Sequence, residues 1–216
     1  MLVLVFDTET TGLPKNREIN KNTISGWPSI VQFSYVIYDT QNNQIVKEFD
    51  RIIKVYTNVV ISDECIKIHG ITNEMSSAQG VIIQTVLLEF FTDVSSADLI
   101  VGHNIDFDIK MIKSELFRLT YHDNTDDLLI YIKCLKQLDS LTNIYCTMKE
   151  TKQLCNIEAQ YKNGNKYIKF PKLRELYEFL FKELPTGFHN SLNDVKYTLR
   201  CFVKVKFNTD INNLYA

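Results

Sequence analysis

Two carboxylates stand one residue apart near the start of the chain, in the stretch FDTETTG at residues 6–12. Residues 2–6 are all apolar and predict a buried strand, which Asp7 and Glu9 terminate. Side chains at i and i+2 of a strand point to the same face. Carboxylates this close repel each other unless one takes up a proton or both bind a divalent cation. Taken alone, the pair is equally consistent with a metal site and with a solvated strand end.

A second acidic stretch, GHNIDFD at residues 102–108, follows another short apolar run. Asn104 is a suitable N-cap for a helix that begins after it. Asp106 and Asp108 then fall in the first helical turn, where acidic groups complement the helix dipole without any further role. The residue pattern does not decide between that role and metal binding, nor which of the two would face a site.

A third stretch, FHNSLND at residues 188–194, supplies an imidazole and another carboxylate. An imidazole is the side chain best suited to accept a proton near neutral pH, so His189 is a candidate general base. The alternative is structural, with Ser191 as a helix N-cap, Asp194 as a capping-box acid and His189 as a surface histidine.

The elements that must position these residues alternate along the chain. The apolar patterns predict strands over 2–7, 30–39 and 45–55, which form an antiparallel meander after a loop at 14–29. The later elements are a helix from Ser62 to Gly70, helices over 80–95, 105–119, 126–138, 172–184 and 191–207, strands over 98–104 and 143–148, and a hairpin over 161–170 around Asn163-Gly164. This order predicts a single α/β domain with a mixed sheet flanked by helices.

Composition excludes several classes of protein. The chain has 216 residues, is 45% hydrophobic and carries a formal net charge of −2, so any nucleic acid must be held by a local patch or by metal ions. Five cysteines without a CxxC pattern predict reduced, buried thiols in an intracellular protein. The N-terminus lacks the basic segment of a signal peptide and no apolar run reaches membrane-spanning length, which predicts a soluble protein without a membrane partner.

Together the three stretches resemble, in order and internal spacing, the three exonuclease motifs of the DnaQ-like, DEDDh family of 3′–5′ exonucleases. The carboxylates come as D-x-E, then as an Asp that ends HNxxFD, then as H-x4-D. The resemblance runs from residue 2 to about residue 203 and includes IHGIT at 68–72, which is similar to a turn of the family. FPKLRELY with HNSLNDV resembles the branch related to the polymerase III proofreading subunit.

The resemblance implies an RNase H-like exonuclease domain over residues 1–207, with a C-terminal tail over 208–216. It implies that Asp7, Glu9, Asp108 and Asp194 bind two Mg²⁺ or Mn²⁺ ions about 4 Å apart, with His189 as the general base. It also implies a set of substrate-binding residues around the terminal nucleotide. These are Thr10, Thr11, Gly12, Leu13, His69, His103, Asn104 and Phe107.

Basic residues outnumber acidic ones seven to three between Lys149 and Glu175. This segment either holds backbone phosphates upstream of the cleaved end or is an ordinary solvated face. Tyr161 and Tyr167 in the predicted hairpin either stack bases or, as the more favoured interpretation, pair with each other across the strands.

The predicted activity is metal-dependent 3′–5′ hydrolysis of single-stranded or frayed DNA ends, which releases nucleoside 5′-monophosphates. An RNA 3′-end trimming exonuclease of the same family is the alternative, because contacts to a 2′-hydroxyl are not readable from one sequence. A non-catalytic nucleic-acid-binding module is the alternative from another class, but it would lack at least one of the five residues. No motif indicates a polymerase partner or an oligomeric state.

Overall fold

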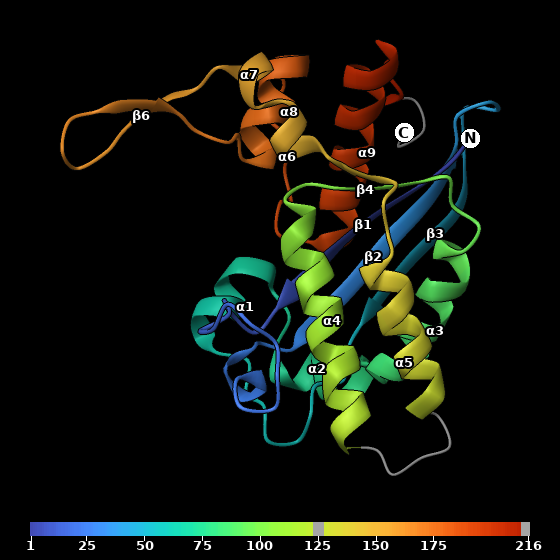
Figure 1. The fold of residues 1–216 in the computed structure, drawn as a ribbon. Coiled ribbons are helices and arrows are strands. Elements are labelled where there is room, and N and C mark those ends of the chain that lie inside the picture. The colour runs from blue at the N-terminus through green and yellow to red at the C-terminus, as the bar shows by residue number, and fades with distance from the viewer. Residues whose placement is uncertain (123–127, 213–216) are drawn as a thin grey trace.

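A computed structural model describes residues 1–122 and 128–212, and Figure 1 shows a twisted sheet between layers of helices. Its five strands lie in the order β3-β2-β1-β4-β5. The bounds are β1 Leu2–Thr10, β2 Ile30–Asp39, β3 Gln44–Ile52, β4 Leu99–Gly102 and β5 Ile144–Cys146. Strands β1, β2 and β3 pair antiparallel, whereas β4 and β5 run parallel to β1. The predicted meander and the mixed α/β sheet are therefore confirmed.

Strand β1 lies at the centre because both of its faces are apolar. Leu4 and Phe6 point into the larger core cluster, whereas Val3 and Val5 point into a second cluster on the opposite face. The first cluster is filled from α3 (Ile83–Val94), α4 (Ile105–His122) and α5 (Leu128–Asp139), and the second from α9 (Ser191–Phe207). The period of two in a strand thus decides which helix layer each side chain of β1 meets.

The remaining helices are short. They are η1 Ile24–Gly26, α1 Asp63–His69, α2 Asn73–Gln79, α6 Thr147–Glu150, α7 Lys152–Cys155 and α8 Leu173–Phe181. Helix α1 has the predicted caps, because Ser62 accepts a hydrogen bond from Cys65 N and Gly70 has a φ of 78°. Helix α2 was not predicted, since its sequence NEMSSAQ has no apolar period. The first two residues of the predicted helix 126–138 lie outside the described residues.

One predicted cap is wrong. Helix α9 is capped by Asn190, whose side chain accepts a hydrogen bond from Asn193 N, and not by Ser191. Ser191 is the first helical residue instead, and its hydroxyl donates a hydrogen bond to the carbonyl of Asp7, 2.8 Å away. The start of α9 is therefore fastened directly to the end of β1.

The predicted hairpin forms a two-stranded sheet of its own, β6 (Glu158–Gln160) with β7 (Lys166–Ile168). We call residues 157–170 the arm. Figure 1 shows it extending away from the body of the domain. The favoured prediction for its two tyrosines is confirmed, because the rings of Tyr161 and Tyr167 stack with centroids 4.1 Å apart.

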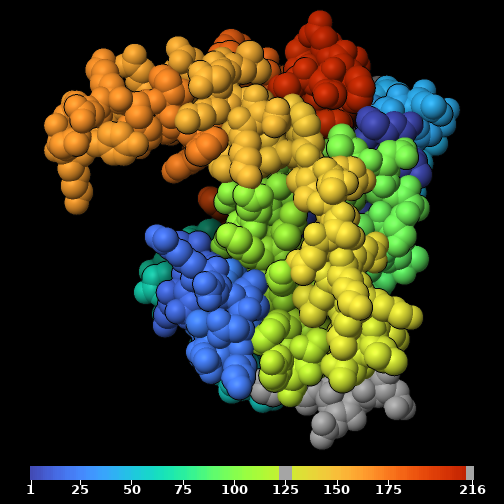
Figure 2. Space-filling view, viewed as in Figure 1, coloured from blue at the N-terminus to red at the C-terminus, as the bar shows by residue number. Residues whose placement is uncertain are grey.

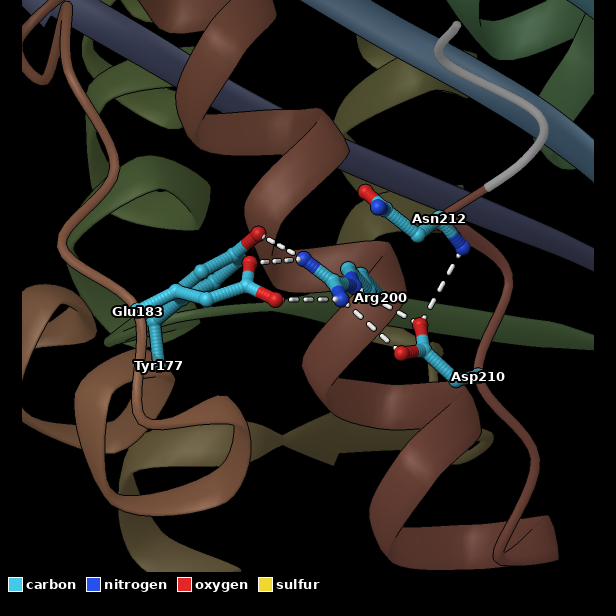
Figure 3. A network of polar contacts seen from close by, with 5 residues as sticks. All are labelled: Tyr177, Glu183, Arg200, Asp210 and Asn212. Carbon is cyan, nitrogen blue, oxygen red and sulfur yellow. Dashed lines mark hydrogen bonds and ion pairs between the residues drawn. The ribbon is translucent and has the colours of Figure 1, made fainter.

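A buried arginine in α9 joins the end of α8 to the segment after α9 (Figure 3). Arg200 is 2% exposed, yet it donates hydrogen bonds to both carboxylate oxygens of Asp210 at 2.7 and 2.8 Å. It also donates to Glu183 at 2.9 Å and to the hydroxyl of Tyr177. Ile211, next to Asp210, is fully buried. The first residues of the expected C-terminal tail therefore pack on the domain.

The cysteines and helices agree with two further expectations from the sequence. All five cysteines are free, and only Cys65 among them is not buried. Within the described ranges, no helix combines the length and the apolar character that crossing a membrane requires.

Candidate active site

The end of β1 brings two segments together. Thr8 lies between Asp7 and Glu9, and both its backbone N–H and its hydroxyl donate to Oδ1 of Asp108, at 3.1 and 2.7 Å. These contacts draw the first turn of α4 against the strand across 100 residues of sequence. The strand register shifts between Glu9 and Thr10, and β1 ends at Thr10, one residue after the second carboxylate.

The start of α9 adds the third segment. One ligand atom from each of Glu9, His189 and Asp194 lies within 4.8 Å of those of the other two. Oδ2 of Asp194 accepts a hydrogen bond from the backbone N–H of His189, at 3.1 Å. His189 has a φ of 65°, a left-handed conformation that the predicted surface role would not require. Asp194 thus fixes the backbone of His189, and the imidazole of His189 lies beside the same carboxylate.

Burial raises the pKa values of all four carboxylates, and neighbouring carboxylates raise those of Asp7, Glu9 and Asp108 further. Burial, followed by the charges of Asp108, Asp194 and Glu9, raises the pKa of Asp7 well above its ordinary range. Burial also raises the pKa of Glu9 to about 8 and the pKa values of Asp108 and Asp194 to about 7. In the described part of the chain, none of the four pairs with a lysine or arginine. The fold therefore gathers negative charge without supplying a counter-charge.

The donor set fits hard divalent cations. Oδ1 of Asp194 is buried and has no hydrogen-bond partner among residues 1–122 and 128–212. An unsatisfied buried carboxylate oxygen is costly, and a cation would satisfy it. Oxygen ligands of this kind are those that Mg²⁺ and Mn²⁺ prefer. The group of Glu9, His189 and Asp194 is thus arranged as a metal-binding cluster would be.

The structure separates the two acids of the second motif. Asp108 is 3% exposed and lies beside Asp7. The Asp106 side chain is 54% exposed and forms an ion pair with Lys149. The choice of Asp108, which the family resemblance implied, thus agrees with its position. Asp106 lies two residues earlier on the helix and points out of the cluster.

The residues after β1 form the expected loop beside the cluster. The hydroxyl of Thr10 donates to the carbonyl of Gly12 at 2.7 Å, and Thr11 exchanges two hydrogen bonds with the backbone of Ser29. Gly12 has a φ of 146°, which only glycine adopts readily. Leu13 is 79% exposed on this loop.

The two other histidines of the predicted set differ in availability. Burial lowers the pKa of His69, the backbone of Thr10 partly opposes this, and His189 nearby lowers it further. His69 therefore lies beside the cluster. Both ring nitrogens of His103 already have partners, because Nδ1 lies 2.9 Å from Thr147 Oγ1 and Nε2 donates to the carbonyl of Pro171 at 3.0 Å. Burial lowers its pKa to about 4, so His103 is a neutral structural link.

A cavity of about 460 Å³ adjoins the first turn of α4. Asn104 and Phe107, two of the predicted substrate-binding residues, line it. The other lining residues, which sequence reasoning missed, are Pro14, Asn16, Arg17, Trp27, Asp106 and Lys110. Arg17 and Trp27 come from the loop 14–29, whose role was open. A lone tryptophan and a lone arginine in a polar loop form no motif, so the sequence did not indicate that they line a cavity.

Carboxylates gathered at the end of a sheet are a ligand set that metal-dependent hydrolysis of phosphodiesters can use. Consistent with this, the chain matches the model of the RNase_T exonuclease family over residues 4–202 and belongs to that family. The family assignment confirms the expected DnaQ-like exonuclease and hence an enzyme that hydrolyses phosphodiester bonds. Exonucleases of this type use divalent metal ions. The proofreading branch within the family stays a prediction.

Solved structures give the same fold. Escherichia coli exonuclease I in complex with a dA16 oligonucleotide superimposes with a TM-score of 0.61 at 16% identity, covering 94% of this chain and 41% of that one. Exonuclease I from Methylocaldum szegediense gives 0.62 at 16% identity, covering 99% and 42%. A full-length 3′-exonuclease gives 0.55 at 15% identity, covering 96% and 60%. The chain thus spans about two fifths of the length of the exonuclease I structures. No curated protein matches the sequence.

Proposed function

We propose that this domain is a 3′–5′ exonuclease that removes nucleoside 5′-monophosphates from single-stranded or frayed DNA ends. One observation carries the proposal: three segments, from β1, α4 and α9, bring four carboxylates together without a counter-charge, and one of their buried oxygens has no partner in the described ranges. Asp7, Glu9, Asp108 and Asp194 would hold two Mg²⁺ or Mn²⁺ ions. When bound, such ions lower the pKa of an attacking water and stabilise the leaving 3′-oxygen.

The chain's own residues supply the remaining steps. His189, exposed beside Glu9 and Asp194, accepts the proton of the attacking water. The terminal nucleoside occupies the cavity at the start of α4, with Phe107 against its base and Asn104 at its edge. Leu13, exposed on the loop after β1, closes over the other side of that base. Arg17 and Lys110 in the same cavity favour a phosphate-bearing ligand.

The test is a time course with a 5′-labelled oligonucleotide in the presence of Mg²⁺, Mn²⁺ or EDTA. A ladder that shortens from the 3′ end, and that EDTA abolishes, supports the proposal. Asp108→Asn should remove the activity, whereas Asp139→Asn, the same change at an exposed aspartate outside the cavity, should keep it. Equal loss in both variants, or equal activity, would contradict the assigned ligand.

The same oligonucleotide made as RNA decides between the two substrates. The proposal expects the DNA strand to be degraded faster. Faster loss of the RNA strand would replace it by the RNA-trimming alternative, with the same residues in the same roles. A folded protein that binds both strands and cleaves neither, under every metal condition, would favour a non-catalytic binding module.

A further inference from the structure

The arm is an exposed aromatic surface that the proposed chemistry does not use. Tyr161 is 55% exposed and Tyr167 is 38% exposed. Their rings stack on each other, so each covers one face of its partner and leaves its outer face to solvent. Phe170, at the end of the arm, is also exposed. Large aromatic side chains on a projecting hairpin are typical of a binding surface.

The tip of the arm is fixed by its own hydrogen bonds. Tyr161 N donates to the carbonyl of Asn165, and Gly164 N donates to the carbonyl of Tyr161, both at 2.9 Å. The Gln160 side chain donates to the carbonyl of Gly164 at 2.8 Å. Gly164 has a φ of 89°, which a side chain would disfavour. An ordered tip presents the two rings with little loss of conformational entropy on binding.

The charge of the arm suits a polyanion. Lys162 has no ion-pair partner within the described part of the chain, whereas Lys166 pairs with Glu158. At the base of the arm, the ammonium of Lys152 lies 4.8 Å from the ring centroid of Phe170. Aromatic rings interleaved with lysines are the usual surface for a single strand, because bases stack while the cations meet the phosphates.

The base of the arm is joined to the active site. The carbonyl of Pro171, which follows Phe170 directly, accepts a hydrogen bond from His103. Asn104, the residue after His103, lines the nucleotide cavity. Lys149 of α6 also reaches Asp106 at the start of α4. Figure 2 shows the arm overhanging a hollow whose lower rim is the blue segment between β1 and β2. A strand that ends in the cavity can therefore continue toward the arm.

We propose that the arm binds the single strand of nucleic acid upstream of the nucleotide being removed, with bases stacked on the Tyr161–Tyr167 pair and phosphates beside Lys162. This inference rests on the proposed function, since it takes the polynucleotide to enter at the carboxylate cluster. It assigns to His103 the role of a positioning residue, which holds the arm relative to the cavity.

The experiment compares the wild-type protein with Tyr161→Ala/Tyr167→Ala. Binding of a labelled single-stranded oligomer of about 20 nucleotides is measured by fluorescence anisotropy in EDTA, and should weaken about tenfold because stacked bases are lost. An oligomer of about four nucleotides, too short to reach from the cavity to the arm, should bind both proteins equally. Tyr161→Phe/Tyr167→Phe should retain wild-type affinity, because the rings remain.

Two controls separate the arm from general damage. Tyr121→Ala removes another exposed tyrosine that packs against a neighbouring ring, and it should leave binding unchanged. Lys162→Ala should reduce the dependence of binding on salt by about one counterion, whereas Lys166→Ala, whose lysine is paired, should reduce it less. Loss of binding in Tyr121→Ala, or equal effects on both oligomer lengths, would overturn the inference.

Measuring binding in EDTA distinguishes this inference from the proposed function. If the wild-type protein binds the long oligomer through the tyrosines yet cleaves nothing with metal, binding by the arm is supported and the exonuclease assignment fails. If it cleaves from the 3′ end but the double variant binds and cleaves the long oligomer as the wild type does, the arm is not part of the substrate path. Concentration-dependent self-association that the double variant abolishes, with unchanged oligomer binding, would assign the arm to a second copy instead.

Discussion

Two clusters of charged groups lie along the same helix, α9, and they are built on opposite principles. Near its start, Asp194 joins three other carboxylates, where burial raises all four pKa values and like charges raise that of Asp7 further. Two turns further on, Arg200 is enclosed by Asp210, Glu183 and Tyr177, and it lowers the pKa of Asp210 (Figure 3). The second cluster is neutralised within the protein, whereas no lysine or arginine of the described ranges pairs with the carboxylates of the first. Paired charges of this kind indicate a structural role, and uncompensated ones indicate a binding site.

The largest expected difference between the clusters is in activity. Asp194→Asn should lower the rate of exonuclease cleavage by about a thousandfold or more, because a ligand of the cluster loses its charge. Its melting temperature should stay the same or rise, since repulsion is relieved. Asp210→Asn makes the identical change in the other cluster, at a carboxylate that is paired with Arg200. It should change the rate less than about twofold. The rates are measured on the labelled oligomer at saturating Mg²⁺.

The largest expected difference in stability lies in the other cluster. Arg200→Leu should lower the free energy of unfolding by about 3 kcal/mol, because a buried group with several partners is lost. The remaining carboxylates, Asp210 and Glu183, are half exposed and are rehydrated, which limits the cost. Urea unfolding measures it. Lys206→Leu, an exposed change on the same helix, is the control and should stay within about 0.5 kcal/mol. Equal losses in the two variants would contradict a special role for Arg200.

The pH dependence of stability should have opposite signs in the two clusters. Without metal, Glu9 titrates near 8 and Asp108 near 7 in the folded state, above the values near 4 of unfolded chains. The folded state then holds extra protons, so this stability is present at acidic pH and is lost as the pH rises through 7 to 8. Asp210 has a lowered pKa, so its contribution is lost only as the pH falls through that value.

We therefore expect the melting temperature in EDTA to fall by roughly 5 °C between about pH 5.5 and about pH 8.5. Saturating Mg²⁺ should flatten this slope, because the cation replaces the protons. Asp194→Asn, which removes one of the titrating groups, should have a smaller slope in EDTA than the wild type. A melting temperature that rises with pH in EDTA would show that the four carboxylates do not share protons in the folded state.

The smallest expected effect is that of Glu183→Gln. The Glu183 side chain is half exposed, and Arg200 keeps its bonds to Asp210, so the loss should be below about 1 kcal/mol. Glu183 begins the loop that carries His189, so the variant also asks whether the two clusters are coupled. Unchanged kcat with the small loss of stability supports independent clusters. A kcat lowered tenfold or more would show that Arg200 also positions the His189 loop.

The strands and the site were largely predictable from the sequence because their signals are local or were carried by family motifs. The apolar run before Asp7 predicts a central strand, and Ser62 and Gly70 set the limits of α1. The three motifs identified all four carboxylates. The choice of Asp108 over Asp106 was not readable from periodicity, because it depends on the contact with Thr8, 100 residues away.

The cluster around Arg200 could not be predicted either, because its contacts also join segments that the sequence pattern does not link. Arg200 lies between Leu199 and Cys201, and a charged residue there reads as an exposed helix position. Its burial depends on partners from α8 and from the segment after α9. Glu115 is a similar case, since it is buried in α4 where the backbone N–H of Ile30 and the side chain of Arg118 bind it. Tertiary partners decide whether such a residue is buried, and a single sequence does not name them.

The fastening of Ser191 to Asp7 has a consequence for the order of folding. These residues are 184 positions apart, so the contact closes a loop that contains nearly the whole domain. Closing so long a loop is entropically costly, and such contacts form late in folding. On the ribosome, Asp194 is the last carboxylate to emerge, long after Asp7 and Glu9. On the proposed function, a nascent chain would lack one carboxylate of the cluster until α9 docks, and cleavage would begin only then.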